Sequence, residues 1–270
     1  MIASLFRAAT RIRTLELQAD RDTFVHHLHP LVKMATTLLF LILVISFDRY
    51  QISSLFPFFL YPVGLAILSD TKIRPIAVSL LTVLPFVLFI SLSNIVLDRQ
   101  LAFTIERIPI TYGMLSSVSI LLKTVLTVSA VLLLISTTSV TVLAEQLTRL
   151  KIPSILVLQL MLTYRYIAVL FEEASSMVIA YTLRSSRKRG VAMRDMGVFL
   201  GNLLLRSMDR ADRIYYAMKC RGFQGKYHTR FLTPWSWNDF FFLGLCGVTL
   251  CFFRMVHISH WLEQFVGGWR

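Results

Sequence analysis

The sequence has few cysteines and few acidic residues, and each shortage excludes a class of protein. The three cysteines, Cys220, Cys246 and Cys251, give no disulfide framework of the kind that small secreted domains need, and the last two lie in an apolar run. Only 15 Asp and Glu stand against 28 Lys and Arg, so the net charge is +13, and 16% of the residues are charged. The chain is therefore neither a disulfide scaffold nor a typical soluble domain.

Motifs for catalysis are also missing. The sequence contains no G-x-x-x-x-G-K-S/T phosphate loop, no H-E-x-x-H, no G-x-S-x-G and no Gly-rich dinucleotide turn. Two groups of histidines occur, but no Cys or carboxylate stands near them at convincing ligand spacing: His26, His27 and His29, then His257 and His260. We expect no catalytic residue, cofactor or metal in this chain. If the protein uses ATP, another chain must hydrolyse it.

Apolar residues are abundant, at 56% of the 270. About 20 consecutive apolar residues suffice to cross a bilayer, and five segments meet this requirement: 31–47, 52–68, 76–97, 114–135 and 238–258. Prolines in the second segment predict a kink. An ionisable group inside a span needs a partner, a cavity or access to the surface, which applies to Lys123 and to Arg254. The sequence predicts an all-α membrane protein with about five transmembrane helices.

The distribution of Lys and Arg predicts the orientation of these helices. With the amino terminus inside, cytoplasmic segments hold 22 of the basic residues and outer segments hold five. Residues 141–234 alone contain 15 basic and six acidic residues. The predicted organisation is a cytoplasmic tail (1–30), four membrane helices (31–138), a basic cytoplasmic region (139–235) and a last membrane helix with the carboxyl terminus (236–270).

Two long helices are expected in the basic region, at about 155–183 and 193–219. The apolar stretch 155–171 is long enough to resemble a sixth span. Polar and charged residues favour an interfacial or bundle-packed helix instead: Gln159, Arg165, Glu172 and Glu173. The cationic break 185–190 separates the two helices, which are expected to form a hairpin or to cross.

A short helical signature occurs twice in this region. The first motif reads A-x-x-x-R-S (Ala180, Arg184, Ser185), and the second reads A-x-x-x-R-G (Ala217, Arg221, Gly222). Positions i and i+4 share one helix face, so each motif sets a small Ala beside a planar cationic fork. A matched pair of this kind predicts docking into two similar protein grooves. The alternatives from charge alone are solvent or anionic lipid headgroups, with nucleic acid least favoured.

The chain resembles a known family over nearly its whole length. Matching segments are Thr23–His26, His29–Lys33, Ser136–Thr138, Leu147–Pro153, Tyr164–Ile167, Glu172–Glu173 and Arg206–Arg213, together with the two motifs. They are similar to the transmembrane coupling (T) component of energy-coupling factor (ECF) type ABC transporters, the CbiQ/EcfT family, and closest to its cobalt and nickel members. Many relatives read L-D-P-R-x-K where this chain has Leu28-His29-Pro30-Leu31-Val32-Lys33.

The resemblance implies a non-catalytic scaffold in the plasma membrane of a prokaryote. Its expected partners are two ABC ATPase subunits, which hold the ATP and Mg²⁺, and a substrate-capturing S component. The resemblance gives Arg184 and Arg221 the role of docking cations, Ala180 and Ala217 that of close-approach positions, and Ser185 and Gly222 that of helix ends. The expected substrate is cobalt or nickel. A vitamin-type ECF system is the alternative, and a stand-alone secondary transporter using Lys123, Asn94 and Asp98 is a more distant one.

Overall fold

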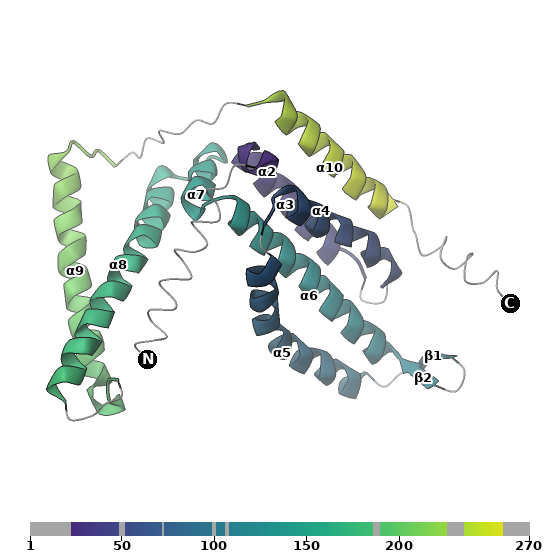
Figure 1. Cartoon of the computed structure of the whole chain (residues 1–270), viewed down its shortest axis with the longest axis horizontal. Helices are drawn as coiled ribbons and strands as arrows, with labels where there is room; N and C mark the ends of the chain where they lie inside the picture. The colour runs from purple at the N-terminus through teal and green to yellow at the C-terminus, as the bar shows by residue number, and fades with distance from the viewer. Residues whose placement is uncertain are drawn as a thin grey trace. The chain divides into compact units, whose positions relative to one another are not determined.

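The computed structural model describes residues 23–48, 52–71, 73–98, 101–105, 108–185, 190–225 and 235–255. The chain divides into two compact units, with boundaries between Thr138 and Ser139 and between Leu232 and Thr233. We call the described residues of 139–225 the hairpin unit and the remaining described residues the bundle unit. Figure 1 shows the elements of both.

The bundle unit consists almost entirely of helices. In chain order they are α2 (Phe24–His27), α3 (Pro30–Ile45), the 3-10 helix η1 (Ser53–Phe59), α4 (Leu60–Leu68), α5 (Ile73–Leu97), α6 (Tyr112–Thr137) and α10 (Trp237–Met255). The all-α prediction holds, and each of the five predicted spans is a helix over most of its length; residues 256–258 of the fifth lie outside the described residues. The second span begins as η1, which contains Pro57, and this agrees with the irregularity expected from its prolines.

Four helices in the described part of the chain are long and apolar enough to cross a membrane: the 74–96 part of α5, α6, α8 (Ser154–Arg184) and α10. Two of the predicted spans are shorter, because α3 has 16 residues and α4 only nine. A helix rises 1.5 Å per residue, so α3 is about 24 Å long. By length and composition alone, α8 also qualifies as a membrane-spanning helix. The charged residues of α8 nevertheless favour the predicted position outside the membrane core.

Aromatic and aliphatic side chains from five elements form the core of the bundle unit. Phe40 and Val44 of α3 meet Phe58 of η1 and Tyr61 of α4, and Leu126 of α6 and Leu250 of α10 complete the cluster. The rings of Phe40 and Tyr61 stack with centroids 4.5 Å apart. In lipid, such close packing holds helices together because burial from water contributes little there.

Helix α5 packs along α6 through small and polar residues. Ser117 donates to the Ser91 carbonyl at 2.6 Å, and Asn94 Nδ2 donates to Ser116 Oγ at 3.0 Å. A Cβ on Gly113 would lie 2.5 Å from the carbonyl oxygen of Asp98, so only glycine permits this approach.

One polar cluster joins the beginning of α3 to the beginning of α10. His29 caps α3, since its Nδ1 accepts a hydrogen bond from the Leu31 amide at 3.1 Å. The His29 amide in turn donates to the buried carboxylate of Asp239 at 2.7 Å, and the imidazole stacks on Trp235. The imidazole thus performs the capping that an Asp side chain performs at helix starts.

The ionisable side chains predicted inside spans both have partners. Lys123 Nζ donates to the Phe47 carbonyl at 2.6 Å. Arg254 lies over the ring of Phe47 at 4.2 Å and contacts Ser46. Both cations therefore bind the carboxyl-terminal end of α3 and the residues just after it.

A two-stranded antiparallel hairpin precedes α6 and was not predicted from the sequence. Strand β1 (Leu101–Ile105) pairs with β2 (Ile108–Thr111), with Ile105 opposite Ile108. The β-branched residues at 105, 108 and 110 favour such pairing, but the segment is too short to show an alternating pattern.

The hairpin unit contains α7 (Val140–Arg149), α8 (Ser154–Arg184), the 3-10 helix η2 (Met193–Asp195) and α9 (Met196–Cys220). These bounds agree with the predicted helices at 155–183 and 193–219. Helices α8 and α9 contact each other near the turn that separates them and diverge toward their other ends (Figure 1), which agrees with the expected hairpin.

Candidate functional site

The first motif occupies the last turn of α8. Ala180 and Arg184 are exposed, and the helix ends at Ser185, whose backbone is extended (φ −94°, ψ 145°). The Ser185 amide still donates to the Tyr181 carbonyl at 2.9 Å. In the described part of the chain, no ion-pair partner is found for the Arg184 guanidinium, so it is available to a ligand.

The second motif occupies the last turn of α9 and ends differently. Arg221 caps the helix, and Gly222 has φ +80°. The Gly222 amide donates to the Lys219 carbonyl and the Phe223 amide to the Met218 carbonyl. This is the Schellman arrangement, in which glycine supplies the left-handed residue. Ala217, Arg221 and Gly222 are all exposed, so this motif also presents its cation to solvent.

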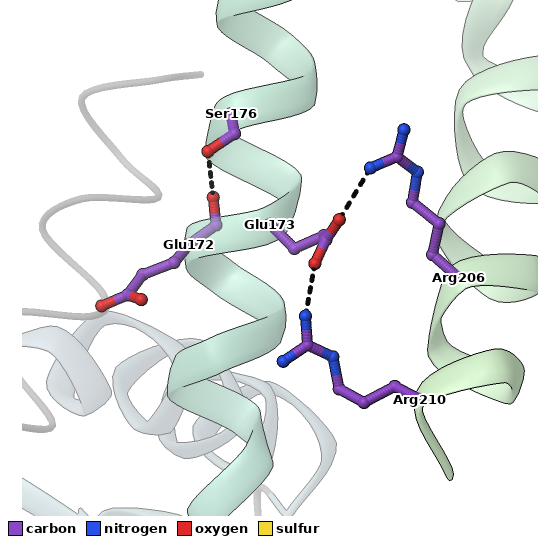
Figure 2. Close-up of polar contacts among 5 residues, drawn as sticks. All are labelled: Glu172, Glu173, Ser176, Arg206 and Arg210. Carbon is purple, nitrogen blue, oxygen red and sulfur yellow. Dashed lines mark hydrogen bonds and ion pairs between the residues drawn. The ribbon is translucent and has the colours of Figure 1, made fainter. Parts of the chain in front are cut away.

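Helices α8 and α9 are joined by a carboxylate held between two guanidinium groups (Figure 2). Glu173 Oε1 accepts from Arg206 Nη1 at 2.8 Å, and Glu173 Oε2 accepts from Arg210 Nη2 at 2.7 Å. The neighbouring Glu172 points away from α9, and its backbone carbonyl accepts from the Ser176 hydroxyl at 2.9 Å. Charge-assisted hydrogen bonds of this kind are stronger than neutral ones.

This arrangement changes the acidity of the carboxyl group. Glu173 lies in the charged part of α8, beyond its apolar stretch 155–171. The hydrogen bond from Arg206 and the positive charges of Arg210 and Arg206 lower the pKa of Glu173 below its usual value. Glu173 is therefore ionised at neutral pH and holds both arginines.

A second cross-helix contact lies closer to the turn. The Tyr181 hydroxyl donates to Asp195 Oδ2 at 2.5 Å. The α8 residues of the two contacts, Glu173 and Tyr181, follow each other along the chain. Their partners come in the reverse order, from Arg210 in α9 back to Asp195, the N-cap residue of α9. The two helices are therefore antiparallel along this stretch.

A groove of about 550 Å³ lies between α8 and α9 beside the first motif. Arg184 and Arg206 contribute positive charge, while Val198 and Phe199 contribute apolar surface; the remaining lining residues are Met177, Ala180, Tyr181, Asp195 and Asn202. The first motif thus contributes Ala180 and Arg184 to the wall of a groove that contains two arginines. The second motif lies at a helix end where its three residues are exposed.

The sequence identified the six motif residues but missed the contacts behind them. Glu173, Arg206 and Arg210 were visible as charges at helical spacing, yet spacing alone does not show which carboxylate of the pair 172–173 faces the neighbouring helix. The contact of Tyr181 with Asp195 had no signal in the sequence.

The other polar residues considered from the sequence contribute to helix contacts. Asn94 and Asp98 bind the start of α6, and Lys123 binds the end of α3, so the three do not converge. His29 caps α3, and His257 and His260 lie outside the described residues. No group of three or more potential metal ligands is present among the described residues, and no cofactor site is proposed.

Comparison with known proteins identifies a relationship over most of the chain. The family model described as "Cobalt transport protein" (CbiQ) matches residues 21–231, which include both motifs and both helices of the hairpin unit. An uncharacterized protein of Methanocaldococcus jannaschii is 32% identical over 100 residues, and this match covers 37% of each chain.

Proposed function

Because this chain belongs to the CbiQ family of cobalt transport proteins, with a match over residues 21–231, we propose that it is the T component of an ECF-type importer. Membership makes it a membrane-embedded component of transport. The finer role that we propose is that of a scaffold, which transmits ATP-driven motion from two ATPase subunits to a substrate-capturing S component. The chain itself needs no catalytic residue for this role.

The observation that carries the proposal is the pair of exposed motifs at the ends of α8 and α9. Each presents an exposed arginine one helical turn beyond an exposed alanine. The alanine permits a partner surface to approach the helix, and the guanidinium supplies a fixed fork of donors to acceptors in that surface. Two equal motifs suit two ATPase subunits, one groove for each.

The exposed apolar face of α9 supports a second kind of partner. Leu200, Leu204 and Met208 are all more than half exposed and recur every fourth residue, on the side opposite Arg206 and Arg210. No residue of α9 is buried. An apolar stripe of this size is covered in a working complex, and we assign it to contact with the S component.

The proposed placement puts the amino terminus and residues 139–235 in the cytoplasm of a prokaryotic cell. The basic composition of this region supports that orientation. The family description favours cobalt as the substrate, with nickel close to it chemically. A vitamin is the alternative, because the S component selects the substrate in such systems.

Reversing the charge of both docking cations tests the scaffold role. In the variant R184E/R221E, we expect loss of the ATPase subunits during purification of the complex. A buried charge pair that loses one partner typically costs about 2–5 kcal/mol in binding, so two such losses abolish recovery. ATPase subunits that co-purify with the tagged chain are measured against the wild type.

Arg194→Glu is the matched control, since this arginine is exposed in the same unit but belongs to neither motif. Normal recovery of ATPase subunits with the double variant would contradict the docking role. Substrate flux through liposomes that contain this chain alone would favour the stand-alone transporter instead.

A further inference from the structure

The repeat in the hairpin unit is longer than the two motifs. Glu173 stands seven residues before Ala180 and 11 before Arg184, and Arg210 stands seven residues before Ala217 and 11 before Arg221. A second alanine also recurs, as Ala174 and Ala211 directly after these charges. Glu173 and Arg210 therefore occupy equivalent positions in two copies of one 13-residue segment, 173–185 and 210–222.

These two equivalent residues bind each other. Glu173 Oε2 and Arg210 Nη2 are 2.7 Å apart (Figure 2), and the helices that carry them are antiparallel. A contact between equivalent positions of two antiparallel copies lies on a local twofold axis. The two copies differ at this position, with Glu in the first and Arg in the second, and the opposite charges attract each other, whereas two identical charges in contact would repel.

This symmetry places the two motifs at equal distances from the contact. Eleven residues of α-helix rise about 16 Å, so each arginine lies about 16 Å along its helix from the contact. Because the helices are antiparallel, Arg184 and Arg221 lie on opposite sides of it, about 33 Å apart along the helix direction. Two identical or similar ATPase subunits that are related by a twofold axis require two docking arginines placed symmetrically in this way.

The contact also fixes the direction in which each motif points. A helix turns about 100° per residue, so positions seven and 11 residues on lie within about 20° of the starting direction. Glu173 thus shares its face of α8 with Ala180 and Arg184, and Arg210 shares its face of α9 with Ala217 and Arg221. If one helix rotated about its own axis and the ion pair broke, the motif on that helix would turn by the same angle.

We propose that Glu173 and Arg210, together with Arg206, are positioning residues that form a pivot in the hairpin unit. They set the separation of the two motifs and the direction in which each motif points. This inference rests on the proposed function for its purpose, although the geometry is independent of it. The three side chains are 21%, 32% and 60% exposed for Glu173, Arg210 and Arg206. Ion pairs this exposed are weak, which lets the helices change angle while the pivot point is kept.

A distance measurement between the two motifs tests the pivot directly. Leu183 and Cys220 are equivalent positions, each ten residues beyond the pivot, and both are exposed. Spin labels are attached to Leu183→Cys and to the native Cys220 of the full chain, after Cys246 and Cys251 are replaced by Ala. The wild-type pivot gives one narrow distance distribution.

Glu173→Arg places three arginines together and is expected to broaden and shift this distribution. Glu172→Arg is the matched control, because it makes the same charge change one residue away on a side chain that points away from α9. The swap E173R/R206E/R210E recreates both pairs with reversed charges and should restore the narrow distribution. An unchanged distribution in E173R, or equal damage by E172R, overturns the pivot.

Transport provides the second readout, in liposomes holding this chain with its ATPase and membrane partners and with Co²⁺ as the probe. We expect E173R to lower ATP-driven Co²⁺ uptake about tenfold, the effect of losing two exposed pairs and adding repulsion, while the ATPase subunits are still recovered. The swap variant restores uptake. Should E173R fail to fold, the isosteric E173Q gives a smaller loss of the same kind, and wild-type uptake in E173Q overturns the proposal.

The two proposals fail in distinguishable ways. If the wild-type chain recovers no ATPase subunits, the scaffold role is wrong, but the distance change in E173R still measures the pivot in the chain alone. If R184E/R221E loses the subunits while E173R changes neither distance nor uptake, the docking role stands and the pivot is wrong.

Discussion

The two copies of the repeat carry the same alanine and arginine on helices with different surroundings. The first ends α8, which has buried residues (Ala174, Ser175, Val178) close behind it, and forms a wall of a groove. The second ends α9, which has no buried residue. The first helix stops at an extended serine and the second at a left-handed glycine. What the copies share is therefore the face that presents Ala and Arg, and not the way in which the helix ends.

Single charge reversals are expected to have the largest effect and test whether the two copies are equivalent. If the shared face determines docking, Arg184→Glu and Arg221→Glu each remove one of two equal docking contacts. We expect each to weaken binding of the ATPase pair by about 2–5 kcal/mol and by similar amounts. Affinity of the purified ATPase subunits for the chain in detergent measures both losses.

A clear inequality between the two single variants would break the comparison. A larger loss at Arg184 would mean that the groove beside the first motif, with its apolar wall of Val198 and Phe199, contributes to docking. Arg194→Glu again serves as the control.

The two helix ends should respond differently to alanine. Gly222→Ala forces a residue with a Cβ into φ +80°, which costs about 1 kcal/mol in stability of that end. Ser185→Ala should strain its helix end less, because the backbone at Ser185 is extended (φ −94°, ψ 145°) and accepts any residue. Hydrogen exchange of the amides in each last turn measures the difference, and equal protection losses would contradict it.

Acidification should loosen the contact between the copies. The folded-state pKa of Glu173 is lowered by its arginines, so the stabilisation is present above the unfolded-state pKa and is lost as pH falls through the lower folded value. We expect the distance distribution between labels at 183 and 220 to broaden below the ordinary glutamate pKa. The swap variant, whose pivot has two acids and one arginine, should broaden in the same acidic window, whereas E173R should show no such transition.

Much of this fold was predictable from the sequence because lipid demands continuous apolar helices. The five spans and the helices at 155–183 and 193–219 follow from apolar runs, prolines and the glycine at 222. The shortness of α3 did not follow, since its apolar run continues to Phe47 while the helix ends at Ile45. The β1–β2 pairing was also missed, because a strand pair of this length has too few residues for a periodic signal.

Within the candidate site, the exposed motif residues were predictable from the sequence, but the contacts between α8 and α9 were not. A repeated A-x-x-x-R signature identifies exposed residues through spacing, as at Ala217 and Arg221. The contact of Glu173 with Arg210 joins two helices, and a pattern along one helix does not determine its rotation toward a neighbour. The role of His29 was hidden for a similar reason, since its partner Asp239 lies 210 residues away in the chain.

The first turn of α3 holds both places where the chain leaves and re-enters the bundle unit. Lys33 Nζ binds the Thr137 carbonyl at the end of α6, and one turn earlier His29 binds Asp239 at the start of α10. Residues at the end of α6 and at the start of α10, on either side of the 139–232 segment in the sequence, are therefore bound to neighbouring positions at the start of α3. Under the scaffold role proposed above, substitutions at Lys33 or His29 should disturb coupling although both lie far from the two motifs in the sequence.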